Sequence, residues 1–181
     1  MGLTESEFTV LRRTIATRGT ARIILLPATF FAWSAVISVI LAASQRRPLD
    51  SLFSLAVLAA GFEAIHALHV GVERIGRYIQ VYYETGIDGP QWETTCMSVG
   101  PALPGGGVDP LFSILFASAT VANLIPVFLS APSRLILAIS GVLHAVFLVR
   151  VGRARWAAAR QRAVELESYR AIHSGSPAAR G

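Results

Sequence analysis

Ionisable side chains form a stripe along one face of an apolar segment near the middle of the chain. With about 100° of rotation per residue in an α-helix, they fall within an arc of roughly 140°. The opposite face carries aliphatic residues, among them Ile65 and Leu68. Carboxylates and imidazoles in one row can hold a metal ion, relay protons or join helices through hydrogen bonds. The stripe comprises Glu63, His66, His69, Glu73, Arg74, Arg77, Gln80 and Glu84.

Glu63 is the costly member of the stripe, because it lies about twelve residues into an apolar run of about 21 that is long enough to cross a membrane. A carboxylate at that depth costs on the order of 3 kcal/mol on insertion scales. We therefore expect Glu63 to face the interior of a helix bundle, with His66 one turn along the same face as its nearest partner.

Two further polar residues lie at similar depth in other apolar runs. His144 is about twelve residues into the last run, and Asn123 lies near the centre of the run before it. If the second and fourth runs are in contact, these side chains meet the stripe inside the membrane. The predicted intramembrane cluster comprises Glu63, His66, His69, Glu73, Asn123 and His144.

Three functions fit such a cluster. The first is a satisfied hydrogen-bond network that fixes helix packing in a structural or accessory subunit. The second is ligation of haem b or a divalent metal by His66, His69 and His144 with Glu63. Glu63 and His66 have the Glu-x-x-His spacing of carboxylate-bridged metal bundles, although the second such motif is missing. The third is a proton or small-solute pathway through Glu63. No catalytic constellation is recognisable, so we do not expect an enzyme.

The elements that position these residues follow from the composition. The chain has 181 residues, of which 53% are hydrophobic and only 15% charged. Lipid must therefore be part of its surroundings. The apolar runs predict an all-α integral membrane protein with four transmembrane helices in an antiparallel bundle, and a transmembrane domain over 22–151. The predicted spans are about 23–43, 52–72, 111–130 and 133–151.

Turn and capping signals divide the rest of the chain. Residues 1–21 form an amphipathic segment that opens with a Thr4 capping box and ends where Gly19 breaks the helix. Asp50 caps the second helix, and Asp109-Pro110 starts the third. Residues 85–109 have loop chemistry and are a candidate partner contact. We expect the second and fourth helices to extend past the membrane, with residues 152–181 forming a helical tail that ends in disorder.

The arginines predict the orientation, because cytoplasmic loops carry an excess of basic residues. Eleven arginines flank the spans on one side, against Arg46, Arg47 and Arg134 on the other. This predicts cytoplasmic termini and a cytoplasmic loop 85–109. The eleven are Arg12, Arg13, Arg18, Arg22, Arg74, Arg77, Arg150, Arg153, Arg155, Arg160 and Arg162.

Charge and residue usage also bear on partners and location. Arg74, Arg77, Arg150 and Arg153 are predicted headgroup anchors, and lipid is therefore the partner we expect for the net charge of +5, rather than nucleic acid. A membrane-protein partner or a second copy of the chain is also expected. All sixteen basic residues are arginine, a bias typical of GC-rich coding, which favours a bacterial inner membrane. With a single cysteine, Cys96, no internal disulfide forms.

Overall fold

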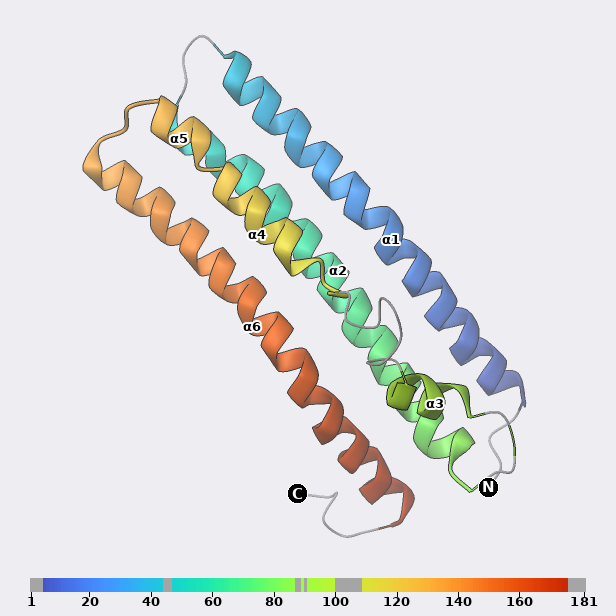
Figure 1. Cartoon of the computed structure of the whole chain (residues 1–181). Helices are drawn as coiled ribbons and strands as arrows, with labels where there is room; N and C mark the ends of the chain where they lie inside the picture. The colour runs from blue at the N-terminus through green and yellow to red at the C-terminus, as the bar shows by residue number, and fades with distance from the viewer. Residues whose placement is uncertain (1–4, 44–46, 87–88, 90, 100–108, 176–181) are drawn as a thin grey trace. The chain divides into compact units, whose positions relative to one another are not determined.

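The computed structural model describes residues 5–43, 47–86, 89, 91–99 and 109–175. Every regular element in these ranges is helical (Figure 1). Three of the helices are long and apolar enough to cross a membrane, in agreement with the prediction of an all-α membrane protein. The elements are α1 (Glu5–Ala42), η1 (Pro48–Asp50), α2 (Ser51–Ile79), η2 (Gln80–Glu84), α3 (Trp92–Val99), α4 (Ser113–Ala122), α5 (Ile125–Leu129) and α6 (Arg134–His173).

Contacts group the chain into two compact units. Unit 1 comprises Met1–Ala21, Leu68–Asp109 and Trp156–Gly181. Unit 2 comprises Arg22–Ala67 and Pro110–Arg155, and it holds most of the apolar sequence. The helices α1, α2 and α6 each contribute residues to both units.

Helix α1 is continuous from Glu5 to Ala42, so the prediction of a break at Gly19 is wrong. A single glycine costs a helix only about 1 kcal/mol relative to alanine, and the residues around it are adequate helix formers. Pro27 also lies inside α1, where its missing N–H leaves the carbonyl of Ile23 without its usual partner. The predicted capping residue, Thr4, lies outside the described residues.

The predicted third span is interrupted in the structure. Its helix starts at Ser113, two residues later than expected, because Phe112 adopts a left-handed conformation with φ 53°. It then stops at Ala122, and α5 follows after a two-residue turn (Figure 1). Pro126 in α5 has no N–H to bond the carbonyl of Ala122, which explains why the helix does not run through. The turn places Asn123 at the break.

The second and fourth helices extend well past the predicted spans, as expected. α2 begins at Ser51, confirming the predicted start, and it continues into a π-helical turn, η2. α6 reaches His173.

The predicted loop 85–109 contains a helix, α3. Glu84 caps it from a distance, since its carboxylate accepts hydrogen bonds from the N–H groups of Glu93 and Thr94, each at 2.8 Å. The Thr94 hydroxyl also donates to Glu84, at 2.7 Å. A cap eight residues before the helix leaves no local capping signal in the sequence.

The core of unit 2 packs around Phe62 of α2, which is fully buried. Its ring makes edge-to-face contacts with Phe116 at 5.2 Å and Phe147 at 5.9 Å between centroids. Gly61, the residue before Phe62, permits the close approach of α1, because a Cβ there would collide with the Thr29 side chain. These contacts position α1, α4 and α6 around α2.

Candidate functional site

Asn123 is the centre of a buried hydrogen-bond network that joins α1, α2 and α6 in unit 2. It has 0% exposed area. The amide oxygen accepts hydrogen bonds from the Trp33 indole at 3.1 Å and the Ser54 hydroxyl at 2.5 Å. The amide nitrogen donates to the Ser51 carbonyl at 2.8 Å and lies 2.9 Å from Nε2 of His144. A primary amide has two donor hydrogens and two oxygen lone pairs, so its bonding capacity is fully used.

Trp33 fixes the orientation of this amide, because an indole N–H can only donate. The amide oxygen therefore faces Trp33, and the amide nitrogen faces His144. The other ring nitrogen of His144, Nδ1, lies 2.7 Å from the Ser140 carbonyl, which can only accept. Nδ1 consequently carries the hydrogen and Nε2 accepts from Asn123. The network holds His144 as one neutral tautomer.

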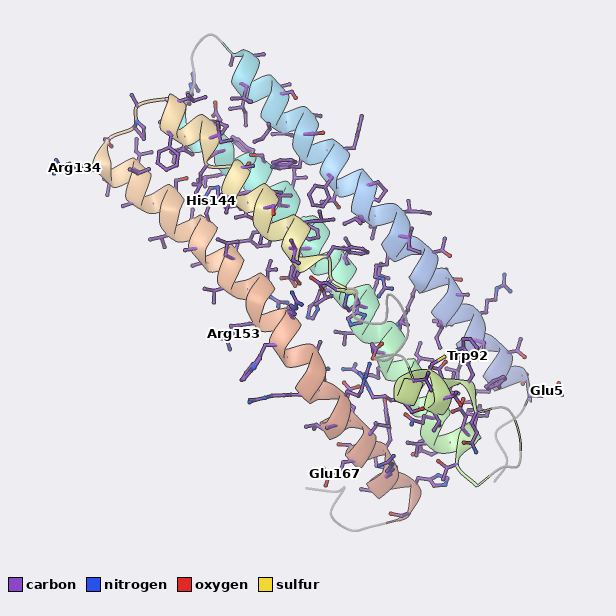
Figure 2. All side chains as sticks on the ribbon, in the orientation of Figure 1. Glu5, Trp92, Arg134, His144, Arg153 and Glu167 are labelled. Atoms are coloured by element: carbon purple, nitrogen blue, oxygen red, sulfur yellow. The ribbon has the colours of Figure 1, made fainter. Side chains whose placement is uncertain are left out.

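The sequence identified Asn123 and His144 but not the residues that complete the network. Trp33 looks like an ordinary interfacial or packing residue, and Ser51 contributes a backbone carbonyl. Neither type of contact leaves a sequence signal. Figure 2 labels His144 on the part of α6 that lies beside α4.

Glu63 forms an ion pair with Arg150 of α6. One carboxylate oxygen accepts from the guanidinium at 2.8 Å, and the two side chains are 48% and 40% exposed. The Arg150 guanidinium also lies over the Phe62 ring, 5.9 Å from its centroid. Glu63 is thus half-exposed, whereas we expected a fully interior position with His66 as its partner. Arg150, which the sequence suggested only as a headgroup anchor, provides the counter-charge.

His66 stacks on Phe62, with the ring planes 6° apart and the centroids separated by 6.1 Å. Its Nδ1 atom is buried and has no hydrogen-bond partner among the described residues. The next histidine of the stripe, His69, belongs to unit 1 and is buried there. The stripe is therefore divided between the two units.

The structure does not bring Glu63 and His144 together, although both are in unit 2. His144 bonds to Asn123 near the first turn of α2, whereas Glu63 meets Arg150, six residues further along α6. The sequence estimate assumed that α2 and α6 begin at the same depth.

No group of three histidine, cysteine, aspartate or glutamate side chains within the described ranges is arranged to hold a metal ion. Both ring nitrogens of His144 are already engaged in hydrogen bonds. A ligand histidine needs one nitrogen free for the metal. The geometry therefore gives the haem or metal interpretation no support.

Unit 1 contains a second polar cluster, centred on Arg77 of α2. Its side chain is only 3% exposed and donates to Glu165 of α6 through Nε at 2.8 Å. It also donates to Glu73, one turn earlier, at 3.1 Å. Arg162 donates to the same Glu73 oxygen at 3.1 Å. Ion pairs of this kind join α2 to α6 within unit 1.

Glu165 accepts from Gln161 at 2.7 Å and from Arg74 at 3.3 Å, in addition to Arg77. Burial alone raises the pKa of its carboxyl, but the hydrogen bonds from Gln161 and Arg77 and the nearby arginine charges outweigh burial and lower the pKa. At Glu93 the effect of burial on the carboxyl pKa exceeds that of the neighbouring charge. Burial raises the pKa of that carboxyl despite its ion pair with Arg12.

The four predicted headgroup anchors have different surroundings. Arg77 is buried between two carboxylates, and Arg74 is half-exposed beside Glu165. Arg150 pairs with Glu63. Arg153 is exposed and points away from the ribbon of α6 (Figure 2). Of the four, Arg153 has the surroundings most typical of an anchor.

Comparison with known protein families, with curated proteins and with solved structures gives no match.

Proposed function

We propose that this chain is a structural or accessory subunit of a membrane assembly, and that its intramembrane polar residues serve to hold its helices together. The observation that carries the proposal is the saturated amide of Asn123, whose four hydrogen bonds reach α1, α2 and α6. An amide with no unused donor or acceptor specifies helix packing and has no free group with which to bind a substrate.

The proposed architecture has four membrane-crossing segments in antiparallel order, with α4 and α5 together forming the third. Large apolar side chains that are exposed on α1 and α6 would contact lipid, among them Phe31 and Leu135. Arg134 starts α6 and the next charge is Arg150, sixteen residues or about 24 Å further on. The hydrocarbon core is about 30 Å thick. On this scale His144 lies between the two charges, about 15 Å along α6 from Arg134.

The distribution of arginines supports placing the chain in a bacterial inner membrane with both termini on the cytoplasmic side. Unit 1 would then be cytoplasmic, with its ion pairs and α3 available to a partner. Cys96 lies in α3 and is the only cysteine of the chain, which makes it a natural reporter of sidedness.

A thiol-labelling experiment tests this orientation. A membrane-impermeant maleimide should label Cys96 only after the cells are permeabilised. In a Cys96→Ala background, the exposed position Ser133 between α5 and α6, changed to cysteine, should be labelled in intact cells. Labelling of both positions from the same side would contradict four crossings.

The subunit role is tested by purification from native membranes in a mild detergent. The chain should co-purify with a second membrane protein in a fixed ratio, and liposomes that contain the chain alone should show no proton flux. The pathway alternative through Glu63 predicts flux that Glu63→Gln abolishes. A lone chain with such flux would overturn the proposal. The ion pair between Glu63 and Arg150 weighs against this alternative, because it joins α2 to α6 as a structural contact.

A further inference from the structure

A groove of about 330 Å³ runs between α2 and α6 in unit 2 and ends at the pair Glu63 and Arg150. On α2 its lining residues recur every three or four positions, so they form one stripe along the helix. Two of them, Ala56 and Ala59, have only a methyl side chain, and this creates the hollow. The buried side chains of Leu55 and Phe147 form its floor.

The geometry points to a phospholipid as the occupant: we propose that the groove binds one acyl chain of a zwitterionic lipid whose headgroup carries a primary ammonium and a phosphate. The groove extends from Leu52 to Glu63, eleven residues or about 16 Å of helix. One leaflet contributes about half of a hydrocarbon core of roughly 30 Å. The length of the groove is therefore comparable to that of one acyl chain.

The charges at the mouth of the groove complement such a headgroup. The ion pair uses one oxygen of Glu63 and one terminal nitrogen of Arg150. Both side chains are about half-exposed, so the second oxygen and the remaining N–H groups can reach a ligand. A primary ammonium can donate to Glu63 while the phosphate accepts from Arg150. An anionic headgroup without an ammonium would leave Glu63 facing a negative charge.

The position along α6 agrees with a headgroup site. Arg150 lies about 24 Å beyond Arg134, and Arg153 and Arg155 follow it on exposed positions. The mouth of the groove is therefore near the membrane surface that these arginines face, and its apolar walls extend from there into the hydrocarbon. The inference requires that α2 and α6 cross the membrane, as in the proposed function, but not the cytoplasmic orientation or the subunit role.

The test is lipid retention by the full chain in bilayer nanodiscs that contain equal amounts of phosphatidylethanolamine and phosphatidylglycerol. After extraction into detergent, native mass spectrometry should find one phosphatidylethanolamine bound per wild-type chain. Ala59→Leu fills the groove and should reduce this retention about tenfold. Ala60→Leu is the matched control, since Ala60 is the adjacent, exposed alanine outside the groove lining, and it should retain the lipid.

Headgroup choice is tested with Glu63→Gln. Loss of the carboxylate removes the acceptor for the ammonium and frees Arg150 for an anionic phosphate, so the ratio of bound phosphatidylethanolamine to phosphatidylglycerol should fall about tenfold. A wild type that retains both lipids equally, or an unchanged ratio in Glu63→Gln, would overturn the headgroup assignment. Equal lipid retention in Ala59→Leu and Ala60→Leu would contradict a lipid site in the groove. A wild-type dimer that binds no lipid, and that Ala59→Leu dissociates, would contradict it as well.

A photo-crosslinking experiment covers the case in which Ala59→Leu fails to fold. Phosphatidylethanolamine with a diazirine at the end of one acyl chain should crosslink wild-type peptides that contain Leu52 or Leu143, which line the groove. Crosslinks spread evenly over the exposed faces of α1 and α6 would indicate ordinary lipid contact and contradict a specific site. Retention of lipid without a co-purified partner protein would support this inference and contradict the proposed subunit role, so the two can fail separately.

Discussion

The side-chain nitrogen of Asn123 lies 2.9 Å from Nε2 of His144, and the two residues connect the break after α4 to the third turn of α6. A buried polar pair inside an apolar bundle is costly unless each group has its partners. Here Trp33, Ser51 and Ser54 supply the remaining contacts of Asn123, and the Ser140 carbonyl supplies that of His144. Neither Asn123 nor His144 therefore needs water or a cofactor for this purpose.

Replacing Asn123 by leucine should destabilise the protein by about 2–4 kcal/mol. Leucine is close in volume but leaves the Trp33 indole and Nε2 of His144 without their partner, and each buried unsatisfied group costs about 1–3 kcal/mol. The measurement is thermal unfolding in detergent, with helix content as the monitored signal. Ser118→Ala, at an exposed position on α4, should leave the unfolding temperature unchanged. An Asn123→Leu protein as stable as wild type would show that the network does not hold the helices.

Gly61→Ala should cost about 1–3 kcal/mol, because the added Cβ collides with Thr29 and forces α1 away from α2. Gly141→Ala is the matched control. It lies within α6, has open space around the new methyl group, and should be neutral or slightly stabilising because alanine favours helix. Equal unfolding temperatures for the two variants would contradict the close approach.

Acid should weaken unit 1 through Glu165. The pKa of Glu165 is lowered from its usual 4.5 in the folded protein. Its ionised form therefore stabilises the folded state above about pH 4.5, and this contribution is lost as the pH falls through the lowered value. The gap in unfolding temperature between wild type and Glu165→Gln should shrink from pH 7 toward pH 3. The pKa of Glu93 is raised, so the difference in unfolding temperature between wild type and Glu93→Gln should change with pH in the opposite direction. Parallel curves for all three proteins would contradict both assignments.

Glu84→Ala should loosen α3, since it removes the carboxylate that bonds the first amides of this helix. N-cap losses cost about 0.5–2 kcal/mol. Cys96, a free thiol within α3, should react faster with a maleimide, and amide exchange over residues 92–99 should accelerate. Glu167→Ala, at an exposed position of α6, is the control. An unchanged labelling rate would show that other contacts hold α3.

Sequence periodicity predicted the helical class, the start of α2 at Ser51 and the long extensions of α2 and α6, because apolar runs and helix formers are local properties. It failed for the capping of α3, which a distant residue, Glu84, decides. It also failed at Gly19, because the local cost of one glycine is too small to break α1.

The candidate site was predictable in its residue types but not in its pairs. Glu63 and His144 were recognised as unusual, since polar groups in apolar runs are rare. Their partners were not, because the levels of α2 and α6 relative to each other in unit 2 depend on the packing around Phe62. Arg150 was expected to be an anchor at the headgroups and is the counter-ion of Glu63.

The π-helical turn at Gln80–Glu84 sets the direction in which Glu84 points. A π turn holds about one residue more than an α turn, so the same residues in a regular α-helix would turn Glu84 by roughly 100°. In the observed register its carboxylate faces the first amides of α3. The capping of α3 is thus coupled to one local irregularity at the end of α2.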